Sequence, residues 1–163
     1  MMKPWRALLI SALLLFPAVN ATAQTVNGYM KVPNIPGDST AQGHENDIRV
    51  LSVTQAFDLS VRTSSPCSVT LTKPLDMAGP LLFVAAVTGQ NLGEVKIDLD
   101  ASTGDGAANI YQIVLTNTRV LAIISTPQQL TENLTMKGDS ISLAFKPQTG
   151  DGAPTVVGNA TCR

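Results

Sequence analysis

Few residues of this chain are suited to chemistry: one histidine, His44, and two cysteines, Cys67 and Cys162. A Ser-His-Asp or Cys-His catalytic unit would have to use His44 as its base. The acidic segment 44–47 lacks the second histidine of a zinc-binding helix, and a single loop histidine beside acidic residues is typical of a solvated or capping side chain. The chain has no Walker-type glycine loop and no dinucleotide-binding fingerprint. We therefore predict no catalytic, cofactor-binding or metal-ligating residue, and no enzyme activity.

The two cysteines are predicted to form a disulfide. An even number of cysteines in a domain outside the cytoplasm is most simply explained by pairing. Cys67 follows Pro66 in a serine-rich turn and Cys162 is the penultimate residue, so the bond would tie the C-terminal tail to the body of the domain. The cysteines are 95 residues apart. Closing a loop of that length by a disulfide stabilises the folded state by roughly 4–5 kcal/mol. A catalytic thiol is the alternative, but nothing in the sequence places His44 beside either cysteine.

A repeated pentapeptide offers a second candidate for ligand chemistry. Thr-Gly-Asp-Gly-Ala occurs at residues 103–107 and again at 149–153. A calcium-binding repeat would need many oxygen ligands in register, and two isolated copies do not supply them. Asp-Gly favours positive φ and tight turns, so both copies are predicted to be turns.

The N-terminal segment predicts export. Lys3 and Arg6 precede an apolar run at residues 7–16, Pro17 follows, and small residues lead to Ala23. This order is that of a secretory signal peptide covering residues 1–23, cleaved near Ala23. The alternative, a membrane anchor, would need about 20 apolar residues. We therefore expect a single secreted or periplasmic domain at residues 24–163.

Composition narrows the possible partners. The formal charge of −1 becomes −3 once Lys3 and Arg6 are removed, so the domain has no basic surface for nucleic acid or anionic lipid. After signal cleavage no apolar segment is long enough to span a membrane. Charged residues make up only 14% of the chain, against about 25% in ordinary globular domains. Neutral, hydrogen-bonding faces of this kind suit self-association.

The elements that would position these residues are mainly strands. Period-two apolar alternation is typical of half-buried strands. It predicts strands at 29–32, 48–61, 68–71, 95–99, 111–115, 119–124, 130–136 and 141–145. A shift in the alternation between Leu51 and Ala56 predicts a bulge or bend. The expected fold is mainly β, a closed or nearly closed antiparallel β-barrel of about eight or more strands with one α-helix.

The helix is predicted between Pro80 and Gly89. Pro80 lies in the first turn, where its missing N–H costs nothing, and Gly89 ends the helix. Leu81, Val84, Ala85 and Thr88 share one face. A buried strand over 81–87 is the competing interpretation.

Read in order, several segments resemble the Hcp (haemolysin-coregulated protein) family, which forms the tube of type VI secretion systems. These segments are 29–32, 35–39, 44–52, 71–73 with Asp76, 80–82 with Gly89, 111–115, 120–125, 130–135, 145–148 and 151–153. Together they extend over nearly the whole domain. The family's glycine-rich segment after the second strand is replaced by the shorter stretch 62–66.

The resemblance implies a β-barrel with one helix that assembles into homohexameric, stacked rings. It also implies secreted effectors, spike proteins and sheath proteins as partners. By the same resemblance the loop from Asp38 to Asp47 contacts a neighbouring subunit, with Asp38, Ser39, His44, Glu45 and Asp47 as predicted interface residues. A solvated loop is the alternative. The alternative function for the whole protein is an exported monomeric binding module without tube function. The predicted signal peptide and disulfide favour this alternative.

Overall fold

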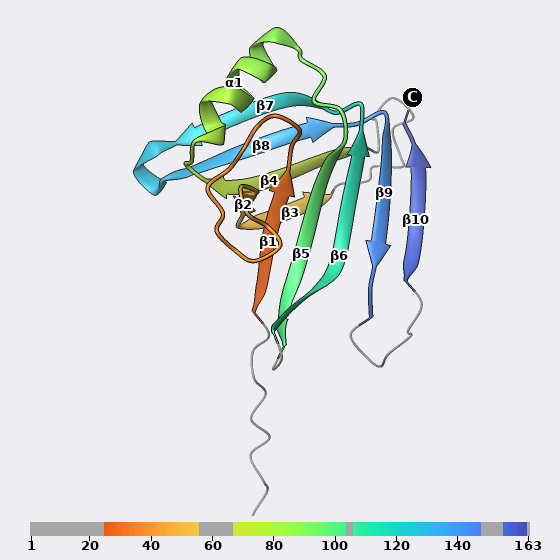
Figure 1. Ribbon diagram of the computed structural model, residues 1–163. Coiled ribbons are helices and arrows are strands. Elements are labelled where there is room, and N and C mark those ends of the chain that lie inside the picture. The colour runs from red at the N-terminus through yellow and green to blue at the C-terminus, as the bar shows by residue number, and fades with distance from the viewer. Residues whose placement is uncertain (1–24, 56–66, 104–105, 148–154, 163) are drawn as a thin grey trace, which may run out of the picture.

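The strands form two antiparallel sheets in a computed structural model that describes residues 25–55, 67–103, 106–147 and 155–162 (Figure 1). The six-stranded sheet has the order β10-β9-β6-β5-β1-β2 and the four-stranded sheet the order β3-β4-β8-β7. The first sheet contains β1 Val26–Lys31, β2 Ile48–Val50, β5 Val95–Thr103, β6 Gly106–Thr116, β9 Ser140–Phe145 and β10 Val156–Thr161. The second contains β3 Ser52–Gln55, β4 Ser68–Pro74, β7 Arg119–Thr126 and β8 Thr131–Lys137, with a 3₁₀ turn at Pro127–Gln129.

The chain passes from one sheet to the other at Leu51. β2 pairs with β1 in the six-stranded sheet, whereas β3 pairs with β4 in the four-stranded sheet. The backbone N–H of Leu51 donates to the carbonyl oxygen of Thr72 at 2.8 Å, which fixes this corner. The bend predicted from the alternation is therefore confirmed, and it turns the chain between sheets whose strands run across each other (Figure 1).

The predicted fold class is confirmed: antiparallel strands dominate and the described residues contain one α-helix. Seven of the eight predicted strands are present, the described part of the one predicted at 48–61 forms the two strands β2 and β3, and β10 is an additional strand. All six residues of β10 are exposed, so it lacks the half-buried alternation by which the other strands were predicted. Among the described residues no strand ladder joins β10 to β7, so the two sheets form a barrel that is open at these edges.

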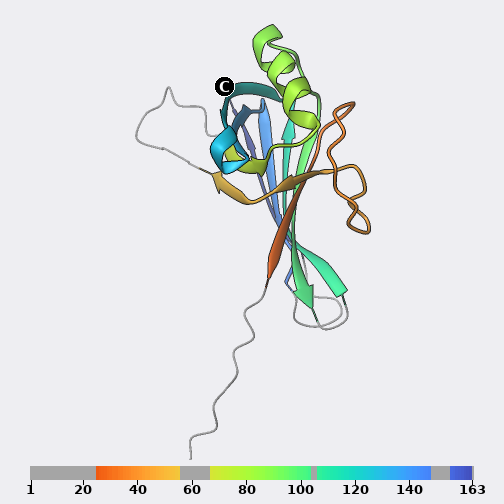
Figure 2. The same cartoon turned by 90° about the vertical axis from the view of Figure 1, so that its left-hand side faces the viewer.

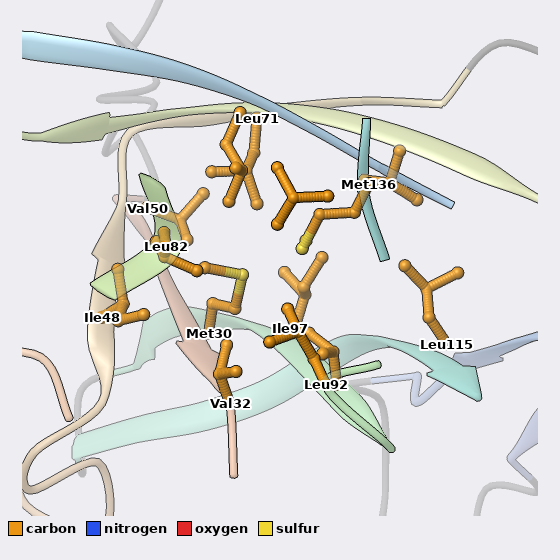
Figure 3. Packing of buried hydrophobic residues seen from close by; sticks show 14 of the residues in the cluster. Met30, Val32, Ile48, Val50, Leu71, Leu82, Leu92, Ile97, Leu115 and Met136 are labelled. Carbon is orange, nitrogen blue, oxygen red and sulfur yellow. The ribbon is translucent and has the colours of Figure 1, made fainter. Parts of the chain in front are cut away.

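Apolar side chains from both sheets fill the space between them. Met30 and Ile97 come from the six-stranded sheet, and Leu71 and Met136 from the four-stranded sheet; all four are at most 1% exposed. Figure 3 shows these side chains pointing toward one another, with Leu82 of the helix among them. Full burial of a side chain of this size contributes about 1.5–3 kcal/mol, so this core accounts for much of the stability.

The single helix, α1 (Ala78–Thr88), lies beside β7 at one end of the barrel (Figures 1 and 2). Gly89 ends it in the left-handed conformation (φ 66°), as predicted. Of the face named from the sequence, Ala85 is buried whereas Leu81 and Val84 are exposed, and Leu82, outside that face, is buried. The helix is apolar on every side, so its sequence could not indicate which face packs on the sheets.

The predicted disulfide is present in the structure. Cys67 precedes β4 and Cys162 follows β10, and their Cα atoms are 5.8 Å apart, within the usual range for disulfides. The hairpin turn between β8 and β9 lies beside it, since Gly138 N–H donates to Cys67 O and Cys162 N–H to Asp139 O. The bond therefore links the edge of one sheet to the other sheet.

Several predictions fall wholly or partly outside the described residues. The signal peptide (1–23), the end of the second predicted strand (56–61), the shortened segment 62–66 and the second pentapeptide (149–153) all do so. The first pentapeptide does so in part: β5 and β6 pair as far as Thr103 and Gly106, and residues 104 and 105 between them lie outside the described part of the chain. No helix in the described part of the chain has the length and apolar character needed to cross a membrane.

Candidate functional site

The loop at residues 36–47 joins β1 to β2 and folds into two arms that bond to each other. The N–H of Gly37 donates to Asn46 O at 2.8 Å, and that of Ser39 donates to Asp47 O at 3.1 Å. The arms approach so closely that a Cβ on Gly37 would lie 2.4 Å from Asp47 O. Only glycine fits there, so the sequence builds a compact loop that projects from the side of the barrel (Figure 2).

The tip of the 36–47 loop is a tight turn. The N–H of His44 donates to Ala41 O at 2.9 Å, and Gly43 adopts a φ of 83°. The Gly43 N–H also donates to both carboxylate oxygens of Glu45, at 3.2 and 3.1 Å. Hydrogen bonds from the backbone N–H groups of Glu45 and Gly43 lower the pKa of the Glu45 carboxyl.

His44 bonds at both of its ring nitrogens. Nδ1 lies 2.9 Å from Asp47 Oδ2 within the loop, and Nε2 lies 2.9 Å from Asp100 Oδ2 on β5. Its ring also stacks on Tyr29 of β1, with centroids 4.1 Å apart and planes 6° from parallel. The histidine is therefore not solvated: it connects the loop to the outer face of the six-stranded sheet.

The surroundings of His44 favour its charged form. Partial burial acts to lower the pKa of His44, but the hydrogen bonds to Asp47 and Asp100 and the negative charges of these carboxylates more than offset it. The pKa therefore lies above its ordinary value of 6.5. The two carboxylates therefore favour the protonated, cationic ring.

A polar network continues from His44 across the sheet. Asp100 Oδ1 accepts a hydrogen bond from Asn109 Nδ2 at 2.9 Å, and the same amide donates to Asp98 Oδ1 at 3.0 Å. Gln112 Nε2 donates to Asp98 Oδ1 at 2.8 Å. The network thus fixes the carboxylate of Asp100 in place to receive His44.

The predicted interface residues divide into two groups. Asp38 and Glu45 are exposed, whereas Ser39 and Asp47 are buried and His44 is largely buried. The exposed pair is free to meet another molecule, and the other three hold the loop in shape. The sequence did not indicate the role of Tyr29 or Asp100, since Asp100 is 56 residues from His44 and only the register of β5 brings them together.

A second charged cluster lies inside the molecule beneath α1. The Lys73 ammonium is 0% exposed; it donates to Asp76 Oδ1 and lies 2.8 Å from Glu132 Oε2. Asp76 Oδ1 also accepts from the N–H of Ala78 at 3.1 Å, and Glu132 Oε1 accepts from Ser125 Oγ at 2.9 Å. This cluster is closed to substrate, and it fixes the start of the helix to β4 and β8.

The outer face of α1 is apolar and exposed. Its exposed apolar side chains are Met77, just before the helix, and Leu81, Phe83, Val84 and Val87 within it. Val87 is 72% exposed. A helix that is apolar all round is normally buried, so this face is a candidate contact surface.

The geometry does not assemble a reaction centre in the described part of the chain. There, no group of three or more His, Cys, Asp or Glu residues is arranged to hold a metal ion. Both nitrogens of His44 are already engaged by carboxylates, so neither is available as a ligand or base. The hollows beside the 36–47 loop, of about 320 and 340 Å³, are lined by loop residues and by the sheet edge. These features suit a contact surface.

Comparison with known proteins matches this architecture. A family model described as "Type VI secretion system effector, Hcp" matches residues 29–149. Protein hcp1 of Pseudomonas aeruginosa is 22% identical over 143 residues, covering 78% of this chain and 88% of that protein.

Solved structures of similar shape include Hcp1 from Salmonella typhimurium, with a TM-score of 0.69, 18% identity, and coverage of 83% of this chain and 94% of that one. The secreted protein Hcp3 from Pseudomonas aeruginosa has a TM-score of 0.67 and 19% identity, covering 85% of this chain and 99% of that one. At these identities the structures show a shared fold.

Proposed function

The chain belongs to the Hcp family of type VI secretion proteins, and on that premise we propose that it is an exported, non-enzymatic subunit that assembles with copies of itself into closed rings. The rings are homohexameric, stack into structures related to the type VI secretion tube, and carry secreted effectors. Spike and sheath proteins are the further expected partners. Residues 1–23 are removed on export, which an intact mass of the exported protein would test.

One observation carries the self-association: the exposed apolar outer face of α1. Soluble monomers rarely expose a continuous apolar surface of this kind, and such surfaces mark contacts with other proteins. In a closed ring the interface is heterologous, so the α1 face of one subunit meets a different surface of the next. The occupant of this face is therefore a second copy of the chain.

The 36–47 loop supplies a second contact in this proposal. It projects from the barrel (Figure 2), and its exposed carboxylates Asp38 and Glu45 are free to meet a neighbour. Ser39, His44 and Asp47 act through the loop by holding its shape. The loop residues predicted from the family resemblance thus have separate roles, two in contact and three in positioning.

The test is the mass of the exported protein in solution, measured by light scattering across a range of concentrations. We expect a ring of several subunits, and a monomer at high concentration would contradict the proposal. Val87→Lys places a charge on the apolar face and should shift the protein toward monomer. Gln90→Lys adds the same charge at an exposed polar position one turn away, and it should leave the ring intact.

A second candidate function is an exported monomeric binding module that keeps the barrel without the tube. The Cys67–Cys162 disulfide favours it, since structural disulfides persist in oxidising compartments. In this case the apolar face of α1 would be covered by a different partner. The same measurement separates the two candidates, because the module would stay monomeric and Val87→Lys would leave its mass unchanged.

A further inference from the structure

The two bonds of the His44 ring impose a requirement on its charge. Nδ1 and Nε2 each lie 2.9 Å from a carboxylate oxygen, of Asp47 and Asp100 respectively. An ionised carboxylate only accepts hydrogen bonds, and a neutral imidazole has one N–H and one acceptor nitrogen. Both bonds therefore form together only when the ring carries its second proton. When the ring loses that proton, one ring nitrogen presents its lone pair to a carboxylate oxygen, and the hydrogen bond between them is lost.

Every charged or titratable group near the ring belongs to the loop or to the adjoining strands. Asp47 and Glu45 lie on the loop, and Asp100 on β5 is linked to Asp98 through Asn109. Tyr29 of β1 presents its ring face, which attracts a cation, and its partner in the strand register is Arg49 of β2. Lys31 of β1 lines a hollow together with Glu45 and Asp47, and Asp38 lines one with Tyr29 and Arg49. Among these groups, the two carboxylates bonded to the ring, Asp47 and Asp100, are the ones that favour its protonated form.

The two bonds have different effects on the fold. The Asp47 bond lies within the loop, whereas the Asp100 bond joins the loop to β5. The other hydrogen bonds of residues 37–47 are internal to the loop, so among the described residues the His44–Asp100 bond is the one that ties it to the sheet. Two contacts of the His44 ring, the hydrogen bond to Asp100 and the stack on Tyr29, thus hold the loop against the sheet, and the hydrogen bond depends on the charge of the ring.

We propose that His44 is a proton-operated latch: the charged ring fastens the 36–47 loop to β5, and the neutral ring releases it. The proposal deepens the proposed function, because it rests on that function for the idea that this loop meets a neighbouring copy. Solution more acidic than the His44 pKa then presents the loop in one fixed position. Alkaline solution frees it and weakens the contact with the neighbour.

The experiment uses the mature exported protein and needs no assignment, because the chain contains a single histidine. The imidazole signals are followed by NMR from pH 5.5 to 8.5, and hydrogen exchange of the 37–47 amides is measured on the same samples, corrected for the intrinsic pH dependence of exchange. We expect the ring to titrate above 6.5 and loop protection to fall about tenfold across that same transition.

Two variants give matched controls. Asp100→Asn removes the acceptor on β5, so it should lower the His44 pKa and leave the loop poorly protected at every pH. His44→Gln cannot titrate, so its loop protection should not change with pH. A wild-type ring that titrates at or below 6.5, or wild-type loop protection that is the same at pH 5.5 and 8.5, would overturn the latch.

Light scattering of the same samples separates the latch from the proposed function. Rings that weaken as the loop is released support both. A monomer at every pH whose loop still opens with the His44 titration supports the latch and contradicts ring assembly. Rings at every pH with a loop of constant protection support assembly and overturn the latch.

Discussion

Two clusters in this molecule each place one cation between two carboxylates, at sites of opposite exposure. Lys73 lies between Asp76 and Glu132, fully buried under α1. His44 lies between Asp47 and Asp100 in the tip turn of the projecting 36–47 loop, with 15% of its side chain exposed. Histidine is the side chain whose charge ordinarily changes between about pH 5 and 8. The His44 cluster therefore contains a group that responds to pH in that range, whereas the Lys73 cluster contains no histidine.

The difference follows from what each cluster holds. The Lys73 cluster fixes α1 to the strands of the core, and a buried ion pair that loses one partner leaves an uncompensated charge in a medium of low dielectric constant. The His44 cluster holds a loop over the outside of a sheet, where water can replace a lost bond. We expect changes to the first cluster to cost global stability and changes to the second to affect mainly the loop.

The largest effect is expected from Lys73→Met. It leaves the carboxylates of Asp76 and Glu132 buried without their cation, so the free energy of unfolding should fall by about 3–5 kcal/mol. Urea denaturation at pH 7 measures the loss. Lys96→Met is the matched control, because the Lys96–Glu94 pair is about half exposed and should contribute at most about 1 kcal/mol.

A double variant, Lys73→Met with Glu132→Leu, sharpens the result. It removes the cation together with one of the two carboxylates, so it should be more stable than Lys73→Met alone. A single variant that unfolds no more easily than Lys96→Met would contradict the assignment of Lys73 as the charge that holds this cluster.

The next effect is expected from Gly79→Ala on α1. A Cβ at Gly79 would lie 2.9 Å from both carboxylate oxygens of Glu132, which Lys73 and Ser125 hold in place. Alanine normally stabilises a helix relative to glycine, but here the overlap should cost about 1–3 kcal/mol in the free energy of unfolding.

Gly158→Ala is the matched control for this substitution. An added Cβ at Gly158 meets no atom within 4 Å, so thermal unfolding should change little. Equal melting temperatures for the two alanine variants would show that Glu132 moves freely and that the buried cluster is not rigid.

How far the sequence could predict these regions depends on how local each signal is. Period-two alternation lies within a strand, so the strands were predicted, whereas β10 has six exposed residues and gave no such signal. Two cysteines allow one pairing, so the disulfide followed from their number. The face of α1 named from the sequence contains the buried Ala85 but not the buried Leu82, since Leu81 and Leu82 are equally apolar and only packing against β7 decides between them.

The clusters depend on register between distant strands. Lys73 and Glu132 face each other because β4 pairs with β8, and Asp100 meets His44 because β5 pairs with β1. Both sets contain residues that the family resemblance singled out, yet their burial and partners are properties of the sheets. Pairing between strands that are far apart in the sequence is not encoded in any short segment, so the sequence alone could not supply it.

The third effect belongs to the His44 cluster and depends on pH. The pKa of His44 is raised in the folded protein, so its contribution to stability is complete below about 6.5 and is lost as the pH rises through the raised pKa. His44→Gln should therefore lower the free energy of unfolding by about 1–2 kcal/mol near pH 6 and by less at pH 8.5.

Urea denaturation of the wild type and His44→Gln at several pH values measures this difference. Arg119→Gln serves as the control, because it removes an exposed charge that does not titrate in this range. Its difference from the wild type should be independent of pH. A His44→Gln difference that grows toward alkaline pH would reverse the sign of the linkage and contradict the charged state of the ring.

The smallest effect is expected from Tyr29→Leu, which removes the ring that stacks on His44 while keeping an apolar side chain on β1. A charged imidazole over an aromatic face gains about 0.5–1 kcal/mol at a partly exposed site. The variant should therefore lower the His44 pKa and weaken the loop slightly at pH 6, with a smaller effect as the pH rises and the ring loses its proton. Tyr29→Phe keeps the aromatic face, so His44 in this variant should titrate as it does in the wild type. If the two variants shifted the histidine titration equally, the stack would be a consequence of packing alone, and the two carboxylates would account for the whole difference between this cluster and the buried one.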